Sequence, residues 1–231
     1  MKKRKLILLA MILFVAYQTT AQTYKIDTSQ VSYENKLRPC LYVKYDASAK
    51  TVKKAWDHFF DKNYNVKIKG IGLLTNKDVI TGTDIILPVI SDKRMNIYAR
   101  ITDEGAGSTM HYFMSFGYDF FIGPENYAAE FTAMKKILND FSVEFLNDYY
   151  LSEAGSITGQ IKDLEKAMKK NNKDIKKNTR KARKGSKEVA NGLSAKNTSL
   201  QMENEEKKRK ISELNKEIEI IKVKQAGITR N

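Results

Sequence analysis

The chain has 231 residues, of which 42% are hydrophobic, and 41 lysines and arginines stand against 27 aspartates and glutamates. This hydrophobic content excludes a wholly disordered chain, and a single cysteine excludes a disulfide-based scaffold. The length suffices for one sizeable domain and an appendage.

The N-terminus has the three-part pattern of a secretory signal peptide. Residues 2–5 are basic, residues 6–17 form an apolar run of twelve, and small residues precede a cleavage site after Ala21. The run is too short for a membrane span, which needs about 20 residues. We therefore expect residues 1–21 to be a cleaved signal peptide and the mature protein to be exported, either periplasmic or secreted. An uncleaved N-terminal anchor is the alternative.

Composition divides the chain near residue 150. Residues 151–231 contain no Phe, Trp, Tyr or Pro and carry 21 basic against 11 acidic side chains, whereas residues 22–150 carry 16 of each. Aromatic side chains supply much of the buried area of globular cores. We therefore expect a globular domain at 37–150 and a differently built segment at 151–231.

The first elements of the domain follow from short patterns. Residues 22–36 are polar and are expected to form a loose lead-in, and residues 40–45 to form a strand. Asp46 or Ser48 is predicted to cap the helix that follows. The apolar residues of that helix recur at i, i+3, i+4, i+7 and i+8 and define one buried stripe: Val52, Ala55, Trp56, Phe59 and Phe60.

Four consecutive strands and a second helix are predicted next. The strands lie at 66–74, where the pattern is weak, and at 83–90, 95–101 and 110–116. Pro88 places the second of them at a sheet edge or a bulge. Gly123 and Pro124 are expected to open a helix whose stripe runs from Tyr127 to Tyr149. The order β-α-β-β-β-β-α predicts an α+β domain, with an antiparallel sheet covered by two helices.

The last eighty residues repeat in sevens. The apolar positions alternate in spacings of four and three, with Asn171 and Asn178 among them: Ile157, Ile161, Leu164, Met168, Ile175, Leu200, Ile211, Leu214, Ile218, Ile221 and Ile228. Residues 185–186 and 191–194 break the pattern. This predicts an antiparallel coiled-coil hairpin at 151–231 with arms at about 157–184 and 196–228. The phase slips near Gly155 and Gly159, where we expect a kink or a short break.

Charge is strongly clustered within this hairpin. Residues 166–187 hold eleven basic residues and one acid. A turn near residue 190 would bring Lys173, Lys176 and Lys177 beside Glu203, Glu205 and Glu206, and Lys166 near Glu213. The basic residues then left unpaired at the hairpin end form the predicted contact site for an anionic group or a partner: Arg180, Lys181, Arg183, Lys184, Lys187 and Lys196. A well-solvated helix face without a partner is the alternative interpretation.

Catalytic and metal-binding patterns are not found in the sequence. His58 and His111 lack further ligands at metal-binding spacing, and no serine or cysteine stands in a recognisable nucleophile motif. Cys40 begins an apolar strand, so we expect a buried thiol, with an intermolecular disulfide or a reactive thiol as alternatives. We expect no catalytic residue, no cofactor and no metal.

Three segments carry a resemblance to a known group of proteins. They are TVKKAWDHFFDKNYNVKIKG, DIILPVISDKRMNIYARITDEGAGS and the helix after Gly123. Together with the signal peptide and the Lys/Glu-rich hairpin, they resemble uncharacterised secreted proteins of Gram-negative bacteria that join a small α+β domain to a C-terminal coiled coil. The resemblance implies an exported location but neither an activity nor functional residues.

Three functions remain open at this point. The first is a non-enzymatic exported module whose hairpin binds another envelope or secreted protein or self-associates. The second is an envelope module whose basic hairpin end binds an anionic polymer or a membrane surface. The third is a ligand-binding or hydrolytic α+β domain. Nucleic acid is disfavoured as a partner, because residues 151–231 have no aromatic side chains for base stacking and the N-terminus is an export signal.

Overall fold

The computed structural model describes residues 24–71 and 78–228, so the predicted signal peptide and part of the predicted strand at 66–74 lie outside the described residues. The chain divides into two compact units, which are described in turn. One comprises Met1–Asn147 with Gly227–Asn231, and the other comprises Asp148–Ala226. The sequence placed this boundary at residue 150.

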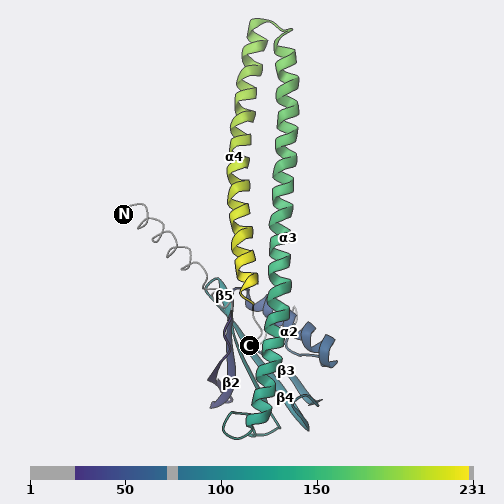
Figure 1. The fold of residues 1–231 in the computed structure, drawn as a ribbon, viewed down its shortest axis with the longest axis vertical. Helices are drawn as coiled ribbons and strands as arrows, with labels where there is room; N and C mark the ends of the chain where they lie inside the picture. Colours follow the sequence, from purple (N-terminus) through teal and green to yellow (C-terminus); the bar gives the residue numbers. More distant parts are fainter. Residues whose placement is uncertain (1–23, 72–77, 229–231) are drawn as a thin grey trace, which may run out of the picture. The chain divides into compact units, whose positions relative to one another are not determined.

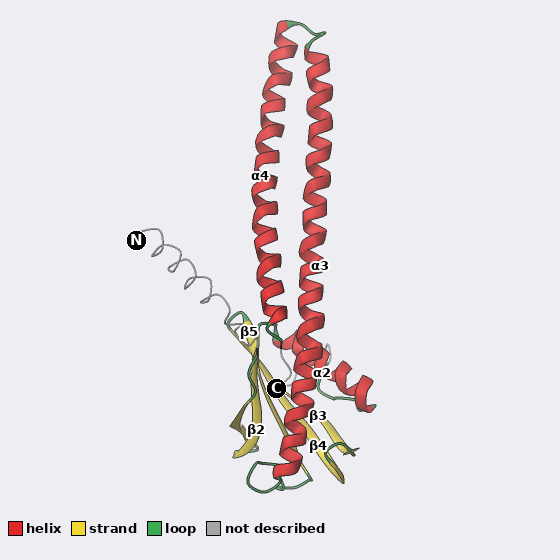
Figure 2. Cartoon of the chain, in the orientation of Figure 1, coloured by secondary structure: helices red, strands yellow, loops and turns green. Residues whose placement is uncertain are grey.

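The first unit contains a five-stranded antiparallel sheet in the order β1-β2-β5-β4-β3 (Figures 1 and 2). Its strands are β1 (Asp27–Tyr33), β2 (Lys36–Tyr45), β3 (Val79–Leu87), β4 (Ser91–Glu104) and β5 (Gly107–Ser115). Every neighbouring pair in the sheet is antiparallel. The predicted α+β class, an antiparallel sheet accompanied by helices, is therefore confirmed.

The predicted loose lead-in at 22–36 is wrong, because Asp27–Tyr33 form β1. This strand pairs with β2 through a tight turn in which Glu34 and Asn35 both have positive φ, 50° and 60°. Two positive φ angles suit a two-residue hairpin turn, because their twist matches that of the strands. Val31 is buried, while the polar residues of β1 lie at the edge of the sheet, where they keep contact with water.

The predicted strand at 66–74 is the other difference in element order. Among its described residues, Lys69 forms an isolated antiparallel bridge with Thr81 of β3, and no named strand forms there. The order is therefore β-β-α-β-β-β, followed by two long helices. The prediction for Pro88 is confirmed in substance: β3 is an edge strand, and its register shifts between Gly82 and Ile85.

Helix α2 (Ala49–Tyr64) forms as its capping residues predict. The Oγ of Ser48 accepts a hydrogen bond from the Thr51 amide, and Asn65 ends the helix in the left-handed conformation. Its buried stripe centres on Trp56. The ring centroid of Trp56 lies 5.0 Å from that of Tyr112 on β5 and 4.8 Å from that of Phe141, which lies on the next helix, α3 (Ala128–Ala182). Trp56 thus joins both helices of this unit to one face of the sheet.

Helix α3 (Ala128–Ala182) begins later than predicted. Gly123 and Pro124 open a turn instead of the helix, and the side chain of Asn126 holds that turn. Its Oδ1 accepts from the Gly123 amide and its Nδ2 donates to the Phe121 carbonyl, both at 2.9 Å. The predicted stripe is otherwise right, because Phe131, Met134, Leu138, Phe141 and Phe145 are all buried.

The strand register decides which residues share a face of the sheet. Leu41, Tyr112 and Ala99 lie side by side across β2, β5 and β4 and face the helices. Tyr42, His111 and Arg100 form the next row, so they point to the opposite face. That opposite face also carries a small apolar cluster of Val31, Cys40, Phe113 and Phe121.

The second unit is a helical hairpin formed by residues 148–182 of α3 and by α4 (Lys187–Ala226). The predicted hairpin and its break at 185–186 are confirmed, since the turn spans residues 183–186. The predicted interruptions near Gly155 and at 191–194 are wrong, because both helices run through them (Figure 1). An exposed glycine weakens a helix by about 1 kcal/mol, which is too little to end one supported by packing on both sides.

The seam of the hairpin follows the predicted heptads. On α3 the buried and half-buried side chains are Ile157, Ile161, Leu164, Met168, Asn171, Ile175, Asn178 and Ala182. On α4 they are Ala190, Leu193, Asn197, Leu200, Asn204, Lys207, Ile211, Leu214, Ile218 and Ile221. Aliphatic residues occupy most of the seam at the end farthest from the turn, whereas amides and alanines occupy much of the seam near the turn.

Candidate functional site

Two asparagine layers set the register of the hairpin. The Nδ2 of Asn171 donates to the Oδ1 of Asn204 at 3.1 Å, and one heptad nearer the turn Asn178 donates to Asn197 at 3.0 Å. Both layers belong to one antiparallel register, because the partners on α4 are also one heptad apart. Buried polar residues of this kind favour this register, since a shift by one heptad would keep only one of the two asparagine pairs. The positions that point away from the seam are thereby fixed as well.

The outward positions of α3 in this register are almost all basic. Successive residues on a helix are rotated by about 100°, so two or three positions per heptad point directly away from the partner helix. Between residues 162 and 180 there are nine such positions, and eight are basic, the exception being Asp163. The eight are Lys162, Lys166, Lys169, Lys170, Lys173, Lys176, Lys177 and Arg180, and all are exposed.

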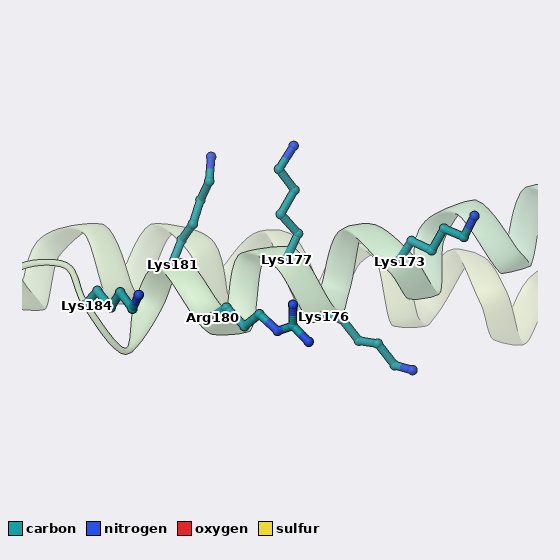
Figure 3. A pocket seen from close by; sticks show the side chains of 6 residues that line it. All are labelled: Lys173, Lys176, Lys177, Arg180, Lys181 and Lys184. Carbon is teal, nitrogen blue, oxygen red and sulfur yellow. The ribbon is translucent and has the colours of Figure 1, made fainter.

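The distal part of this row encloses a shallow hollow of about 360 Å³. Six cations line it: Lys173, Lys176, Lys177, Arg180, Lys181 and Lys184. Figure 3 shows Lys177 and Lys181 projecting side by side from the helix, with Lys176 pointing to the other side. We call the eight outward cations together with Lys181 and Lys184 the cationic face. None of its ten residues is acidic, and the acids of α3 between residues 162 and 180 are Asp163 at an outward position, the exposed Glu165 and the half-buried Asp174.

The cationic face has no ion-pair partners within residues 24–71 and 78–228. The acids of α4 at the same level form ion pairs inside α4 instead, Glu203 with Lys207 at 3.2 Å and Glu205 with Lys208 at 2.7 Å. The expected pairing of Lys173, Lys176 and Lys177 with Glu203, Glu205 and Glu206 is therefore wrong. The turn lies a few residues earlier than 190, and these lysines point away from α4.

The part of α4 opposite the cationic face, residues 191–213, differs sharply from that face in charge. Its eleven outward positions between 191 and 213 hold three glutamates, one arginine and seven uncharged residues. The outward positions are thus cationic along α3 and, with three glutamates against one arginine, weakly acidic along this part of α4. Such one-sided charge defines a direction from which an anionic partner would approach.

The six residues predicted as the contact site are separated by the structure. Arg180, Lys181 and Lys184 lie together at the hollow, whereas Arg183 lies in the turn and Lys187 and Lys196 lie on α4. All six are exposed. Sequence reasoning missed Lys173, Lys176 and Lys177 because it paired them across the seam. Their i, i+3, i+4 spacing with Arg180 and Lys184 was the signal that could have identified the row.

The first unit offers a second depression, of about 340 Å³, between α2 and α3. It contains two carboxylates, but each is already paired: Glu144 with Lys62 at 2.9 Å and Asp140 with Lys136 at 2.6 Å. General acid–base catalysis needs a carboxylate or an imidazole that can exchange a proton with a substrate. This depression therefore presents no recognisable pair of catalytic groups.

His111 and Tyr112 do not form a joint site. Tyr112 faces the helices and is buried against Trp56, whereas His111 lies on the opposite face, with its ring 5.2 Å from that of Tyr42. Burial, followed by the charge of Arg100, lowers the pKa of His111 below its ordinary value of 6.5. The Nδ1 of His111 is buried without a hydrogen-bond partner.

Cys40 is buried, as its position in an apolar strand predicts. Burial raises the pKa of its thiol to about 12, and a hydrogen bond from Ser29 offsets this only partly. A thiol with so high a pKa is almost wholly protonated near neutral pH, and the thiolate is the nucleophilic form. Cys40 therefore behaves as a small apolar core residue.

In the described part of the chain, no helix is both long enough and apolar enough to cross a bilayer. Within residues 24–71 and 78–228, no cluster of three or more His, Cys, Asp or Glu side chains is arranged to hold a metal ion. Comparisons of the chain with protein-family models, with curated proteins and with solved structures each found no match.

Proposed function

We propose that the protein is an exported, non-enzymatic binding module that meets its partner through the coiled-coil hairpin. The observation that carries this proposal is the closed seam. The two arms bury each other's apolar residues, and paired asparagines fix one register. The hairpin is therefore complete without a second chain, and its outward faces are what a partner would contact.

The charge of the hairpin supports a binding role. Helix stability favours alternating charges, and like charges at i, i+4 are each unfavourable by about 0.2–0.5 kcal/mol. The cationic face contains several such pairs, for example Lys173 with Lys177 and Lys177 with Lys181. This repulsion lowers the stability of the helix that carries the row. Binding of an anionic partner would remove the repulsion, and this supports a binding role for the row.

Self-association is the second candidate. Five large apolar side chains lie exposed on the hairpin and could contact a second copy: Leu151, Val189, Met202, Ile220 and Val223. Five single side chains give a small area compared with the roughly 1,200 Å² of a stable interface. We therefore place a heterologous partner first.

The proposal is tested by shortening the hairpin without disturbing its register. Removing residues 171–177 together with 198–204 deletes one matched heptad from each arm in the part near the turn. We expect the shortened chain to lose capture and crosslinking of its partner from an envelope fraction. Retained signal from Trp56, which lies in the other unit, would show that the sheet remains folded.

A matched control removes residues 157–163 together with 212–218. This deletion shortens both arms equally but keeps the distal half, so capture of the same partner should persist. Equal loss in both variants, or capture by a chain that lacks the hairpin entirely, would contradict the proposed role of the hairpin. Light scattering on the intact protein separates a monomer from the self-associated alternative.

A further inference from the structure

We propose that the cationic face of α3 binds a linear polymer of phosphate groups that lies along the helix. This inference deepens the proposed function and rests on it, since it names the chemistry of the partner. The contact surface is the outward side of one helix, including Lys162, Lys166 and Lys170, rather than the hairpin end alone.

The first step is the excess of positive charge. Eight of nine outward positions over residues 162–180 are basic, and Glu203 and Glu205 of α4 form ion pairs within their own helix. Such a row is surrounded by mobile anions in solution. A polymeric anion that replaces them releases many small ions at once, which is the main source of affinity in polyanion binding.

The second step is geometry. The outward cations recur with each helical turn, about every 5.4 Å, and from Lys162 to Arg180 the row extends about 27 Å at 1.5 Å per residue. The row is narrow, because the outward positions of α4 at the same level hold a single basic residue, Arg209. A linear anion fits one narrow row, whereas a compact or planar anion would engage only part of it.

The third step is the type of cation. Nine of the ten residues of the cationic face are lysines, and only Arg180 is an arginine. Lysine acts as a flexible point charge that binds phosphate oxygens without a fixed geometry, whereas arginine favours the bidentate recognition of a single carboxylate or phosphate, so a row of lysines suits a series of anionic groups. Residues 151–231 have no aromatic side chain to stack on bases. The ligand is therefore recognised through its phosphates and not through nucleobases.

A membrane surface fits this face less well. Helices that lie on bilayers place an apolar side into the lipid next to their cations. The apolar side of this part of α3, with Ile161, Leu164 and Met168, is occupied by the seam with α4. The cationic face itself has no large apolar side chain among its ten residues. Anionic vesicles accordingly enter the experiment as the competing outcome.

The experiment measures binding of the intact mature protein to fluorescently labelled inorganic polyphosphate by anisotropy at a series of NaCl concentrations. We expect binding that weakens steeply with salt. Orthophosphate at the same total phosphate concentration should not compete, because a single phosphate cannot span the row. Vesicles of pure phosphatidylglycerol are tested in a parallel sedimentation assay. At equal salt and equal accessible phosphate, the fraction of protein bound to vesicles should be smaller than the fraction bound to polyphosphate.

Two variants with the same change in charge locate the site. Lys177→Gln with Arg180→Gln neutralises two neighbours in the hollow, and Arg209→Gln with Lys216→Gln neutralises two exposed, outward residues of α4. Each removed phosphate contact lowers the slope of log K against log salt by about 1. The α3 variant should therefore lose about two units of slope, while the α4 variant keeps the slope of the unmodified protein. Circular dichroism checks that both remain helical.

Equal slopes for the two variants would overturn the inference, as would competition by orthophosphate or stronger retention by vesicles than by polyphosphate. These failures are distinguishable from failure of the proposed function. If the distal heptad deletion abolishes partner capture but the α3 variant binds its partner normally, the hairpin is the binding element and its ligand is not a polyphosphate. If both deletions capture equally, the proposed function itself is wrong.

Discussion

The side-chain amide of Asn171 donates a hydrogen bond to Asn204 across the hairpin, and Asn204 in turn donates to Asn172 at 3.0 Å. Asn204 is buried, so its amide would have no access to water in another register. A shift by one heptad in either direction would keep one asparagine pair and place the other amides opposite apolar residues or in the turn. The pair therefore keeps α3 and α4 in the alignment that turns the lysines outward.

This relationship predicts opposite effects for single and double substitutions. Asn204→Leu removes the partner of Asn172 and one of the two acceptors of Asn171, which also donates to Glu203, and should destabilise the hairpin by about 0.5–1.5 kcal/mol. Asn171→Leu combined with Asn204→Leu creates an apolar layer and should recover or exceed the original stability. Thermal unfolding followed by circular dichroism measures both.

The double variant should also lose specificity of register. Light scattering and crosslinking between cysteines introduced on the two arms would then report more than one alignment or a higher mass. A double variant that is less stable than Asn204→Leu alone would contradict the role given to this pair.

Sequence patterns predicted those elements whose side chains have a clear period. The stripe around Trp56 and the heptads from Ile157 onward were predicted correctly, because a helix that is buried on one side has apolar residues three and four positions apart. Strand β1 was missed because an edge strand with Ser, Thr and Gln lacks an apolar alternation. Its pairing depends on the turn at Glu34 and Asn35, which local propensity alone does not reveal.

The candidate site was predicted only in part, for a related reason. The abundance of lysine between residues 166 and 187 was visible, but which lysines face α4 depends on register, and register depends on the position of the turn. Because Gly192 was interpreted as a break, the turn was placed too late. A shift of a few residues moved Lys173 and Lys177 from the outward face to the flank of the seam.

Glycine substitutions test the continuity of α3. A Cβ added at Gly155 or Gly159 would meet no atom within 4 Å, and both residues are exposed. Gly155→Ala and Gly159→Ala should therefore each stabilise the protein by about 0.5–1 kcal/mol, because alanine loses less backbone entropy in a helix. Urea denaturation measures the change. A loss of stability in either variant would indicate that the helix needs flexibility there.

Gly107 provides the contrasting case in β5. A Cβ at this position would lie 2.2 Å from the carbonyl oxygen of Tyr45, so the two strands would have to separate. Gly107→Ala should destabilise the protein by several kcal/mol, in the range of severe substitutions. Near-UV circular dichroism would detect the loosened core, while a variant as stable as the unmodified protein would show that the strands adjust freely.

The half-buried imidazole of His111 predicts a dependence of stability on pH. Because burial and then Arg100 lower its pKa below 6.5, the folded state binds fewer protons than the unfolded state just below that pH. The free energy of unfolding should therefore decrease as the pH falls below about 6.5, until His111 is protonated in both states. His111→Gln should flatten this decrease, as measured by denaturation midpoints between about pH 8 and pH 5.

His58 supplies the matched control for this measurement. It is the other of the chain's two histidines and lies exposed on α2. His58→Gln should leave the pH profile close to that of the unmodified protein. Similar flattening by both substitutions would show that the decrease does not arise from the imidazole beside Arg100.

Repulsion along the cationic face predicts that the hairpin becomes more stable as salt is added. Like charges at i, i+4 are unfavourable by about 0.2–0.5 kcal/mol per pair, and salt screens charges over about 10 Å at 0.1 M. Lys173 has such neighbours in both directions, Lys169 and Lys177. Lys173→Gln should therefore raise the midpoint of helix unfolding at about 0.05 M NaCl and have little effect at about 0.5 M. Arg209→Gln is the contrasting variant: its i−4 and i+4 neighbours, Glu205 and Glu213, are acidic, so it should lower the midpoint at low salt and have little effect at high salt. If Lys173→Gln lowers the midpoint at low salt, then Lys173 has a stabilising partner, and the row is not the uncompensated surface on which polyanion binding depends.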